Sequence, residues 1–120
     1  TVVSYLAMVS GVLDAAESTG VDAEVIDLRW LDRASIDWDT LGTSIQKTNR
    51  VLVAEQGPPG TSYGGWLADE IQRRYFDWLD HPVERVVGTE SSPSISKVLE
   101  EAAIAGTEDV ASALTRMSGF

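Results

Sequence analysis

The chain has 120 residues, of which 43% are hydrophobic and 23% charged, and its 19 acidic and 9 basic side chains give a formal charge of −10. This length fits one domain, the apolar content excludes intrinsic disorder, and the acidity disfavours binding to nucleic acid or an anionic membrane. The absence of cysteine excludes disulfides and thiolate chemistry, and the single histidine, His81, excludes a site that needs two imidazoles.

The first half of the chain alternates strand and helix patterns. Residues 1–6 are β-branched and apolar, which predicts a buried strand. A helical face follows over residues 9–16, with Gly20 at the position of a helix-ending glycine, and residues 21–28 predict a second strand. A helix between two strands implies that the strands run parallel.

The same alternation continues to the end of the chain. Asp37 is a candidate N-cap for a helix that ends near Asn49. The remaining predicted elements are a strand at 50–55, a breaker-rich loop at 56–64, a helix at 65–79, a strand at 83–88, a weaker helix at 94–104 and a helix at 107–117. We therefore expect an α/β domain with a largely parallel sheet.

The loop residues 60–64 read Gly-Thr-Ser-Tyr-Gly, which matches the G-x-S-x-G nucleophile elbow of hydrolases. Ser62 would be the nucleophile and His81 the base. Two prolines separate the preceding strand from this turn, and no oxyanion loop is evident, so a plain glycine-rich turn is the preferred interpretation. A phosphate site at the following helix start is a further alternative, although no G-x-G-x-x-G or Walker pattern accompanies it.

The aromatic and acidic residues carry weaker signals. Trp30 and Trp38 lie in a polar stretch, so an interface position for at least one of them and ordinary core packing are equal alternatives. The acidic pairs at 100–101 and 108–109 lack the spacing of a cation-binding loop and indicate solvated helix faces. No complete catalytic constellation emerges from the residues alone.

Several segments in the same order resemble the C-terminal domain of the transketolase family. Residues 2–9 (VVSYLAMV) follow the family's opening strand, except that Leu6 replaces the usual glycine. Residues 24–31 (EVIDLRWL) match its second strand, residues 47–56 (KTNRVLVAEQ) its third, and residues 76–86 (FDWLDHPVERV) the segment before its fourth. The glycine-rich turn keeps Gly64 but loses the preceding glycine pair. The motif residues expected to have structural roles are Asp27, Leu28, Arg29, Glu55 and Gly64.

The likeness is strongest to the β subunit, or a fused αβ chain, of the decarboxylating first component of 2-oxoacid dehydrogenases. It implies a three-layer α/β sandwich with a mostly parallel sheet of about five strands. It also implies that thiamine diphosphate and Mg2+ act in the parent enzyme, bound by other domains, and that this domain carries no catalytic, cofactor-binding or metal-binding residue. The single domain at 1–120 would then be a fragment of a longer chain, as its start inside an apolar run also suggests.

The role implied for such a domain is to support assembly of the subunits and to dock the small basic subunit-binding domain of the acyltransferase component. A charge of −10 suits a basic partner. The expected docking residues are Glu100, Glu101, Glu108, Asp109 and Phe120. The alternatives are the same domain of a transketolase or a deoxyxylulose-phosphate synthase and, more remotely, a serine hydrolase using Ser62. A cytoplasmic, oligomeric oxidoreductase is expected, without membrane or nucleic-acid partners.

Overall fold

A parallel β-sheet forms the centre of the molecule. A computed structural model of the chain describes residues 1–60, 62–89, 96, 98–99 and 104–119. The strand order is β2-β1-β3-β4, and every pair is parallel. The strands are β1 (Val2–Ser4), β2 (Val25–Asp27), β3 (Leu52–Ala54) and β4 (Glu84–Val86). Val3 is in register with Ile26 on one side and with Val53 on the other.

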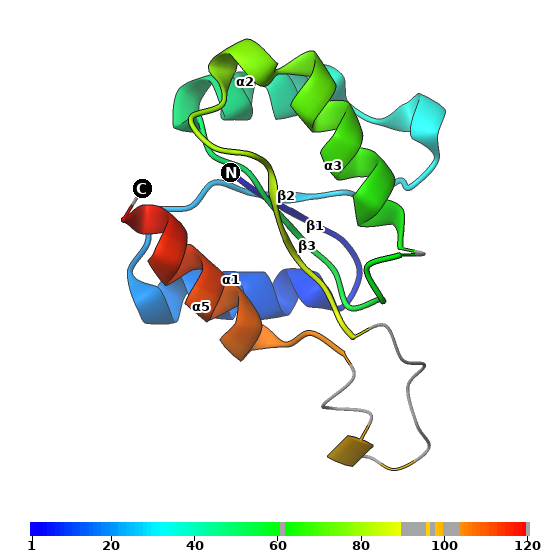
Figure 1. Cartoon of the computed structure of the whole chain (residues 1–120), viewed down its shortest axis with the longest axis vertical. Helices are drawn as coiled ribbons and strands as arrows, with labels where there is room; N and C mark the ends of the chain where they lie inside the picture. Colours follow the sequence, from blue (N-terminus) through cyan, green and yellow to red (C-terminus); the bar gives the residue numbers. More distant parts are fainter. Residues whose placement is uncertain (61, 90–95, 97, 100–103, 120) are drawn as a thin grey trace.

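Helices cover both faces of this sheet (Figure 1), which gives the expected three layers. One face packs against α1 (Met8–Thr19) and α5 (Thr107–Ser118), and the other against α2 (Trp38–Thr48) and α3 (Tyr63–Arg74). Alternate strand residues serve the two cores, because successive side chains point to opposite faces. Val2 and Leu52 pack with α1 and α5, whereas Val3 and Val53 pack with α2 and α3.

Three helix ends lie where the sequence predicts them. Gly20 ends α1 with φ of 70°, and Asn49 ends α2 with φ of 61°, both in the left-handed region that glycine and asparagine tolerate. Asp37 caps the start of α2, since its Oδ1 accepts a hydrogen bond of 3.1 Å from the Thr40 amide. At α5 the cap is Gly106, whose amide donates to the Asp109 carboxylate at 2.9 Å.

The structure differs from the expected elements in three places. The described residues form four strands, one fewer than the resemblance implies, and each strand is three residues long. The third predicted helix ends at Arg74 because Tyr75 leaves helical geometry at φ of −121°, and a 3-10 turn, η2 (Phe76–Trp78), follows. A second such turn, η1 (Arg33–Ser35), precedes α2. Most of the weaker helix expected at 94–104 lies outside the described residues.

Candidate functional site

The carboxyl edge of the sheet, between β1 and β3, is the position where open α/β sheets usually bind ligands. The chain moves from β1 outward to β2 and then returns to β3 on the other side of β1, which creates a topological switch point. Tyr5 follows β1 at this edge and Glu55 follows β3. The chemistry available at the switch point therefore depends on what these two side chains do.

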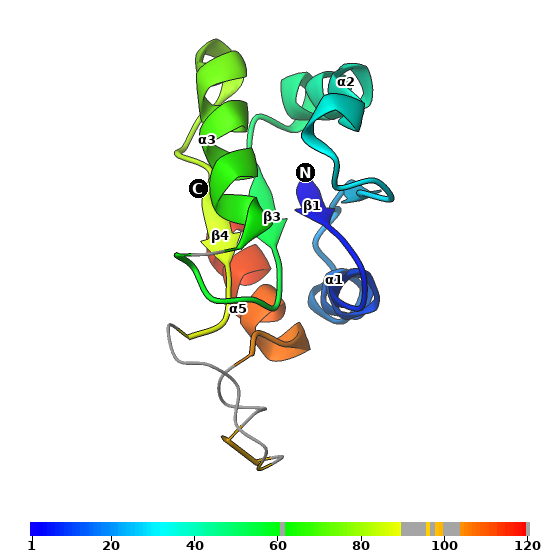
Figure 2. The same cartoon turned by 90° about the vertical axis from the view of Figure 1, so that its right-hand side faces the viewer.

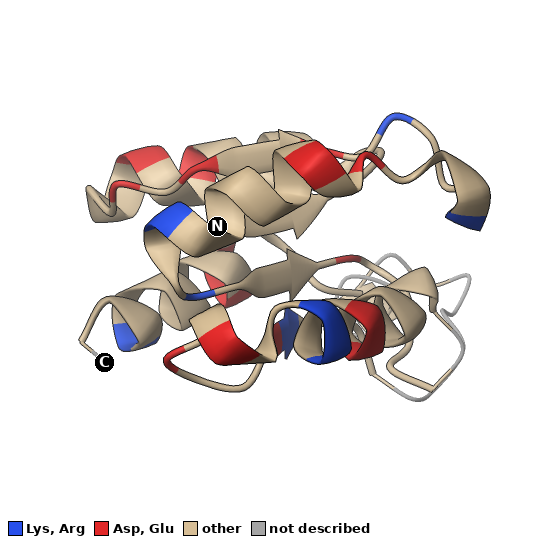
Figure 3. Ribbon diagram, turned by 90° about the horizontal axis from the view of Figure 1, so that it is seen from above, with Lys and Arg blue, Asp and Glu red and all other residues tan. Residues whose placement is uncertain are grey.

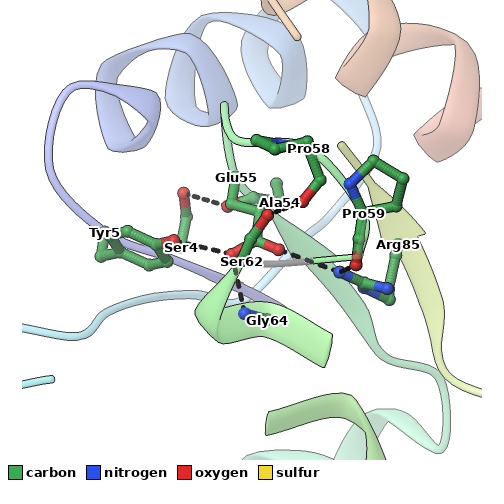
Figure 4. Close-up of polar contacts among 9 residues, drawn as sticks. All are labelled: Ser4, Tyr5, Ala54, Glu55, Pro58, Pro59, Ser62, Gly64 and Arg85. Atoms are coloured by element: carbon green, nitrogen blue, oxygen red, sulfur yellow. Dashed lines mark hydrogen bonds and ion pairs between the residues drawn. The ribbon is translucent and has the colours of Figure 1, made fainter. Parts of the chain in front are cut away.

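Glu55 is completely buried and makes three hydrogen bonds within the domain (Figure 4). Its Oε2 accepts from the Tyr5 hydroxyl at 2.6 Å and from the Gly64 amide at 2.8 Å. Its Oε1 accepts from Arg85 Nη2 at 3.1 Å, which forms an ion pair whose acid is fully buried. A buried carboxylate needs such partners to offset its desolvation.

This arrangement is a structural anchor that fills the switch point. Both carboxylate oxygens are engaged by groups of the same domain, and none of Glu55 is exposed to a substrate. Burial, followed by the hydrogen bond to Glu55, raises the pKa of the Tyr5 hydroxyl, so Tyr5 remains a neutral donor near pH 7. The cluster joins β1, β3, β4 and the start of α3.

Gly64 is required by the close approach of Glu55 to the first turn of α3. A Cβ atom at this position would lie 2.4 Å from Glu55 Oε1, which is closer than real Cβ atoms come to other atoms. The absence of a side chain lets the carboxylate accept the Gly64 amide, and a negative charge at a helix N-terminus is favourable. The family-motif residues Glu55 and Gly64 are thus brought into direct contact.

Further hydrogen bonds hold the loop between β3 and α3, one of them from Arg85 of the same cluster. Arg85 Nη2 donates to the Pro59 carbonyl at 3.0 Å, and the Gly88 amide donates to the Gly57 carbonyl at 2.8 Å. The Ser62 hydroxyl donates to the Pro58 carbonyl (Figure 4). Sequence reasoning missed Tyr5 and Arg85 as partners of Glu55. The available signal was an acid directly after one buried strand and an arginine inside the next.

The hydrolase interpretation does not fit this geometry. Ser62 is the N-cap of α3, whereas His81 follows η2 beyond the other end of that helix. A helix of 12 residues is about 18 Å long, so the two side chains cannot exchange a proton. The described residues of this segment, Gly60 and residues 62–64, lead directly into α3.

The Asp-Leu-Arg motif lies at the carboxyl end of β2, away from Glu55. Arg29 Nε is 2.6 Å from Asp27 Oδ2, and the Arg29 side chain is 81% exposed, so the pair is a surface ion pair. The Leu28 amide donates to the Ser4 carbonyl at 2.8 Å and extends the contact of β2 with β1. These residues border a pocket of about 280 Å3 between this end of β2 and α2.

The tryptophans of the polar stretch have different environments. Trp38 packs against the rings of Trp66 and Tyr75, with centroid distances of 6.5 and 6.4 Å, and Arg74 lies 4.0 Å above its ring. Trp30 is 73% exposed at the surface. An interface role for one of the pair stays a prediction, and Trp30 is the residue to which it now applies.

Two of the expected docking residues lie in the described part of the chain. Glu108 and Asp109 are exposed in the first turn of α5. Glu100, Glu101 and Phe120 lie outside the described residues. Figure 3 shows acidic residues on helices of both layers, so the described acidic residues are not confined to one patch. Their docking role stays a prediction.

Within the described residues, no three His, Asp or Glu side chains are grouped so that they could hold a metal ion. The described helices also include none that is long and apolar enough to cross a membrane.

Comparison with known proteins gives the family. The family model described as "Transketolase, C-terminal domain" matches residues 1–110. The chain belongs to this family. The resemblance inferred from the ordered motifs is thereby confirmed, and the α/β fold class with it.

Relatives of this transketolase C-terminal domain are subunits of larger enzymes. The mitochondrial pyruvate dehydrogenase E1 component subunit beta of Dictyostelium discoideum is 32% identical over 98% of this chain and 33% of its own length. The 3-methyl-2-oxobutanoate dehydrogenase subunit beta of Mycobacterium tuberculosis is 42% identical over 73% of this chain and 26% of its own length. The chain thus spans about a third of the length of its curated relatives.

A solved structure shares the fold. A split-gene transketolase, described as an inactive beta4 tetramer, superposes with a TM-score of 0.75 at 26% identity, over 96% of this chain and 37% of that one. The relatives include mitochondrial and bacterial proteins. The expected cytoplasmic location therefore stays a prediction.

Proposed function

We propose that this domain is the C-terminal part of the β subunit, or of a fused αβ chain, of a thiamine diphosphate-dependent 2-oxoacid dehydrogenase. The observation that carries the proposal is the match to E1 β subunits of pyruvate dehydrogenase over 98% of the chain, together with a match to the branched-chain enzyme's β subunit at 42% identity. Thiamine diphosphate and Mg2+ would be held by other domains of the parent.

The geometry of the domain supports a non-catalytic role within that enzyme. The switch point is filled by the buried Glu55 and its partners, so it offers a substrate no free carboxylate. Ser62 has no imidazole within reach, and the described residues lack a metal-ligand group. On this proposal, the domain contributes a surface for assembly to its parent.

The experiment that tests this proposal uses the full-length parent protein with any partner subunit. Release of CO2 is measured from pyruvate and from branched-chain 2-oxo acids, with and without thiamine diphosphate and Mg2+. Turnover that depends on the cofactor, with preference for one acid, is the expected result. A folded protein that neither binds the cofactor nor releases CO2 from any acid would contradict the proposal.

A second candidate is favoured by the solved relative. The split-gene transketolase has the same fold over 96% of the chain, and the alternative proposal is that this domain belongs to a transketolase-like enzyme. Transfer of a two-carbon unit between sugar phosphates by the full-length protein, with no decarboxylation of 2-oxo acids, would select this candidate.

We further propose that the domain docks the basic subunit-binding domain of an acyltransferase component through its C-terminal acidic residues. Glu108 is exposed in the first turn of α5, and the same third of the chain contributes Glu100 and Glu101. Opposite charges speed association and weaken it with salt.

Charge reversal tests the docking proposal. Glu108→Lys, combined with Glu100→Lys and Glu101→Lys, should weaken binding of the subunit-binding domain by about tenfold or more at low salt. Asp39→Lys is the matched control, because Asp39 is also exposed in the first turn of a helix but belongs to α2 on the opposite layer. Unchanged binding in the triple variant would remove these residues from the docking site.

A further inference from the structure

Leu6 adopts a backbone conformation that leucine rarely occupies. It lies in the turn between β1 and α1 with φ of 54°, in the left-handed region, and its side chain is 77% exposed. An exposed leucine side chain contributes no burial free energy to folding, and glycine would fit this turn without strain. Strained residues of this kind concentrate at functional surfaces.

In their described part, three of the four turns at the carboxyl edge of the sheet contain no charged residue, whereas the fourth, after β2, carries the Asp27–Arg29 ion pair. Residues 5–10, 56–68 and 86–89 contain no Asp, Glu, Lys or Arg. The turns that begin these segments follow β1, β3 and β4 and lie at one edge, because parallel strands end on the same side (Figure 2). We call residues 5–8, 56–60 and 87–89 the uncharged edge.

Hydrogen bonds link the three turns of the uncharged edge. The Gly88 amide donates to the Gly57 carbonyl at 2.8 Å, which joins the turns after β3 and β4. The Tyr5 hydroxyl donates to Glu55, which joins the turn after β1 to the others. The charges beneath the edge, Glu55 and Arg85, neutralise one another in an ion pair. Leu6, Ala7 and the two prolines at 58–59 supply its apolar atoms.

We propose that the uncharged edge packs against an uncharged, apolar surface of the remainder of the parent protein, with Leu6 as the anchoring side chain. Depletion of charge is the compositional mark of the core of an interface, and a few central, fully desolvated side chains contribute most of the binding free energy. The curated relatives are about three times as long as this chain, so the rest of the parent is the natural occupant.

The test measures the accessibility of residue 6 in the assembled, full-length protein. The domain has no cysteine, so Leu6→Cys and the control Leu13→Cys each add one thiol to it. Leu13 is 52% exposed on α1, away from the uncharged edge. Maleimide labelling of each site is followed by peptide mass spectrometry, and each rate is divided by the rate of the same site in denaturant.

In the described structure residue 6 is more exposed than residue 13, so an open edge would label Leu6→Cys at least as fast as Leu13→Cys. The proposal predicts the reverse order, with Leu6→Cys slower by about tenfold or more, independent of protein concentration. Equal or faster labelling would overturn it. Protection that appears only at high protein concentration would also overturn it, by indicating a second copy as the occupant. The labelling needs no enzymatic activity, so its outcome is separate from that of the proposed function.

Discussion

The residue that departs most from its expected chemistry is Leu6, where the resemblance called for glycine. Its φ of 54° explains the family's preference, because only glycine enters this region without a steric penalty. The sequence showed the substitution but not its consequence, since a backbone angle cannot be read from residue types alone.

Leu6→Gly should stabilise the isolated fold. The left-handed conformation costs a leucine roughly 1–2 kcal/mol, and the greater chain entropy of glycine offsets about half of this, so a net gain of about 0.5–1 kcal/mol is expected. Gly20→Ala is the opposite control, because Gly20 has φ of 70° with open space around it, and it should lose about 1 kcal/mol. Urea unfolding measures both. A loss of stability in Leu6→Gly would contradict the assignment of strain.

Glu55 is the second residue whose replacement should strongly change the free energy of unfolding. Glu55→Gln keeps the shape but removes the charge that three donors share, leaving the Arg85 guanidinium without its counter-ion. We expect a loss of about 3–5 kcal/mol in the free energy of unfolding. The matched variant is Glu70→Gln, which breaks a more exposed acid–arginine pair within α3 and should cost about 0.5 kcal/mol or less. If the two substitutions lowered the free energy of unfolding by similar amounts, burial would not be the reason for the stabilising contribution of Glu55.

At the scale of elements, helix ends were the best-predicted features because they depend on local chemistry. Gly20, Asn49 and Asp37 act as side-chain type and position predict. The extent of the third predicted helix was wrong, since the apolar pattern continues past Arg74 although the backbone turns away at Tyr75. Periodicity reports which residues face the core, and a 3-10 turn can place them there as well as a helix.

The cap of α2 makes stability depend on pH. The hydrogen bonds from Thr40 lower the pKa of the Asp37 carboxyl below its usual range, so the folded state favours the ionised form. The stabilisation is therefore fully present above the unfolded pKa of about 4 and is lost as the pH falls through the lower folded value. The difference in Tm between the unsubstituted chain and Asp37→Ala should be constant from neutral pH down to about pH 5 and should shrink at lower pH.

Asp37→Ser separates capping from titration. Serine also caps helices but carries no charge in this pH range, so the difference in Tm between Asp37→Ser and Asp37→Ala should not vary with pH. If the difference in Tm between the unsubstituted chain and Asp37→Ala stayed the same at acidic pH, that result would contradict the role of the ionised carboxylate.

At the scale of the whole molecule, the sequence predicted the three layers but not the buried Glu55 cluster that joins β1, β3 and β4 to the start of α3. Alternating strands and helices indicate a parallel α/β sheet, because a crossover helix leaves few other arrangements. The contact of Tyr5 and Arg85 with Glu55 joins residues 50 and 30 positions apart, and no local pattern encodes it. The same limit applies to function, since the motifs identify the family of the domain but not the activity of its parent protein.

The central claim is that this domain assists a thiamine-dependent enzyme without taking part in its chemistry. The measurement that tests it most directly compares two rates in the full-length protein that carries Glu100→Lys, Glu101→Lys and Glu108→Lys. One is decarboxylation of the preferred 2-oxo acid with a small-molecule electron acceptor, and the other is the overall reaction with the acyltransferase component. We predict that the first rate stays within about twofold of the parent protein while the second falls by about tenfold or more. Equal loss of both rates, or no dependence of either on thiamine diphosphate, would contradict the account.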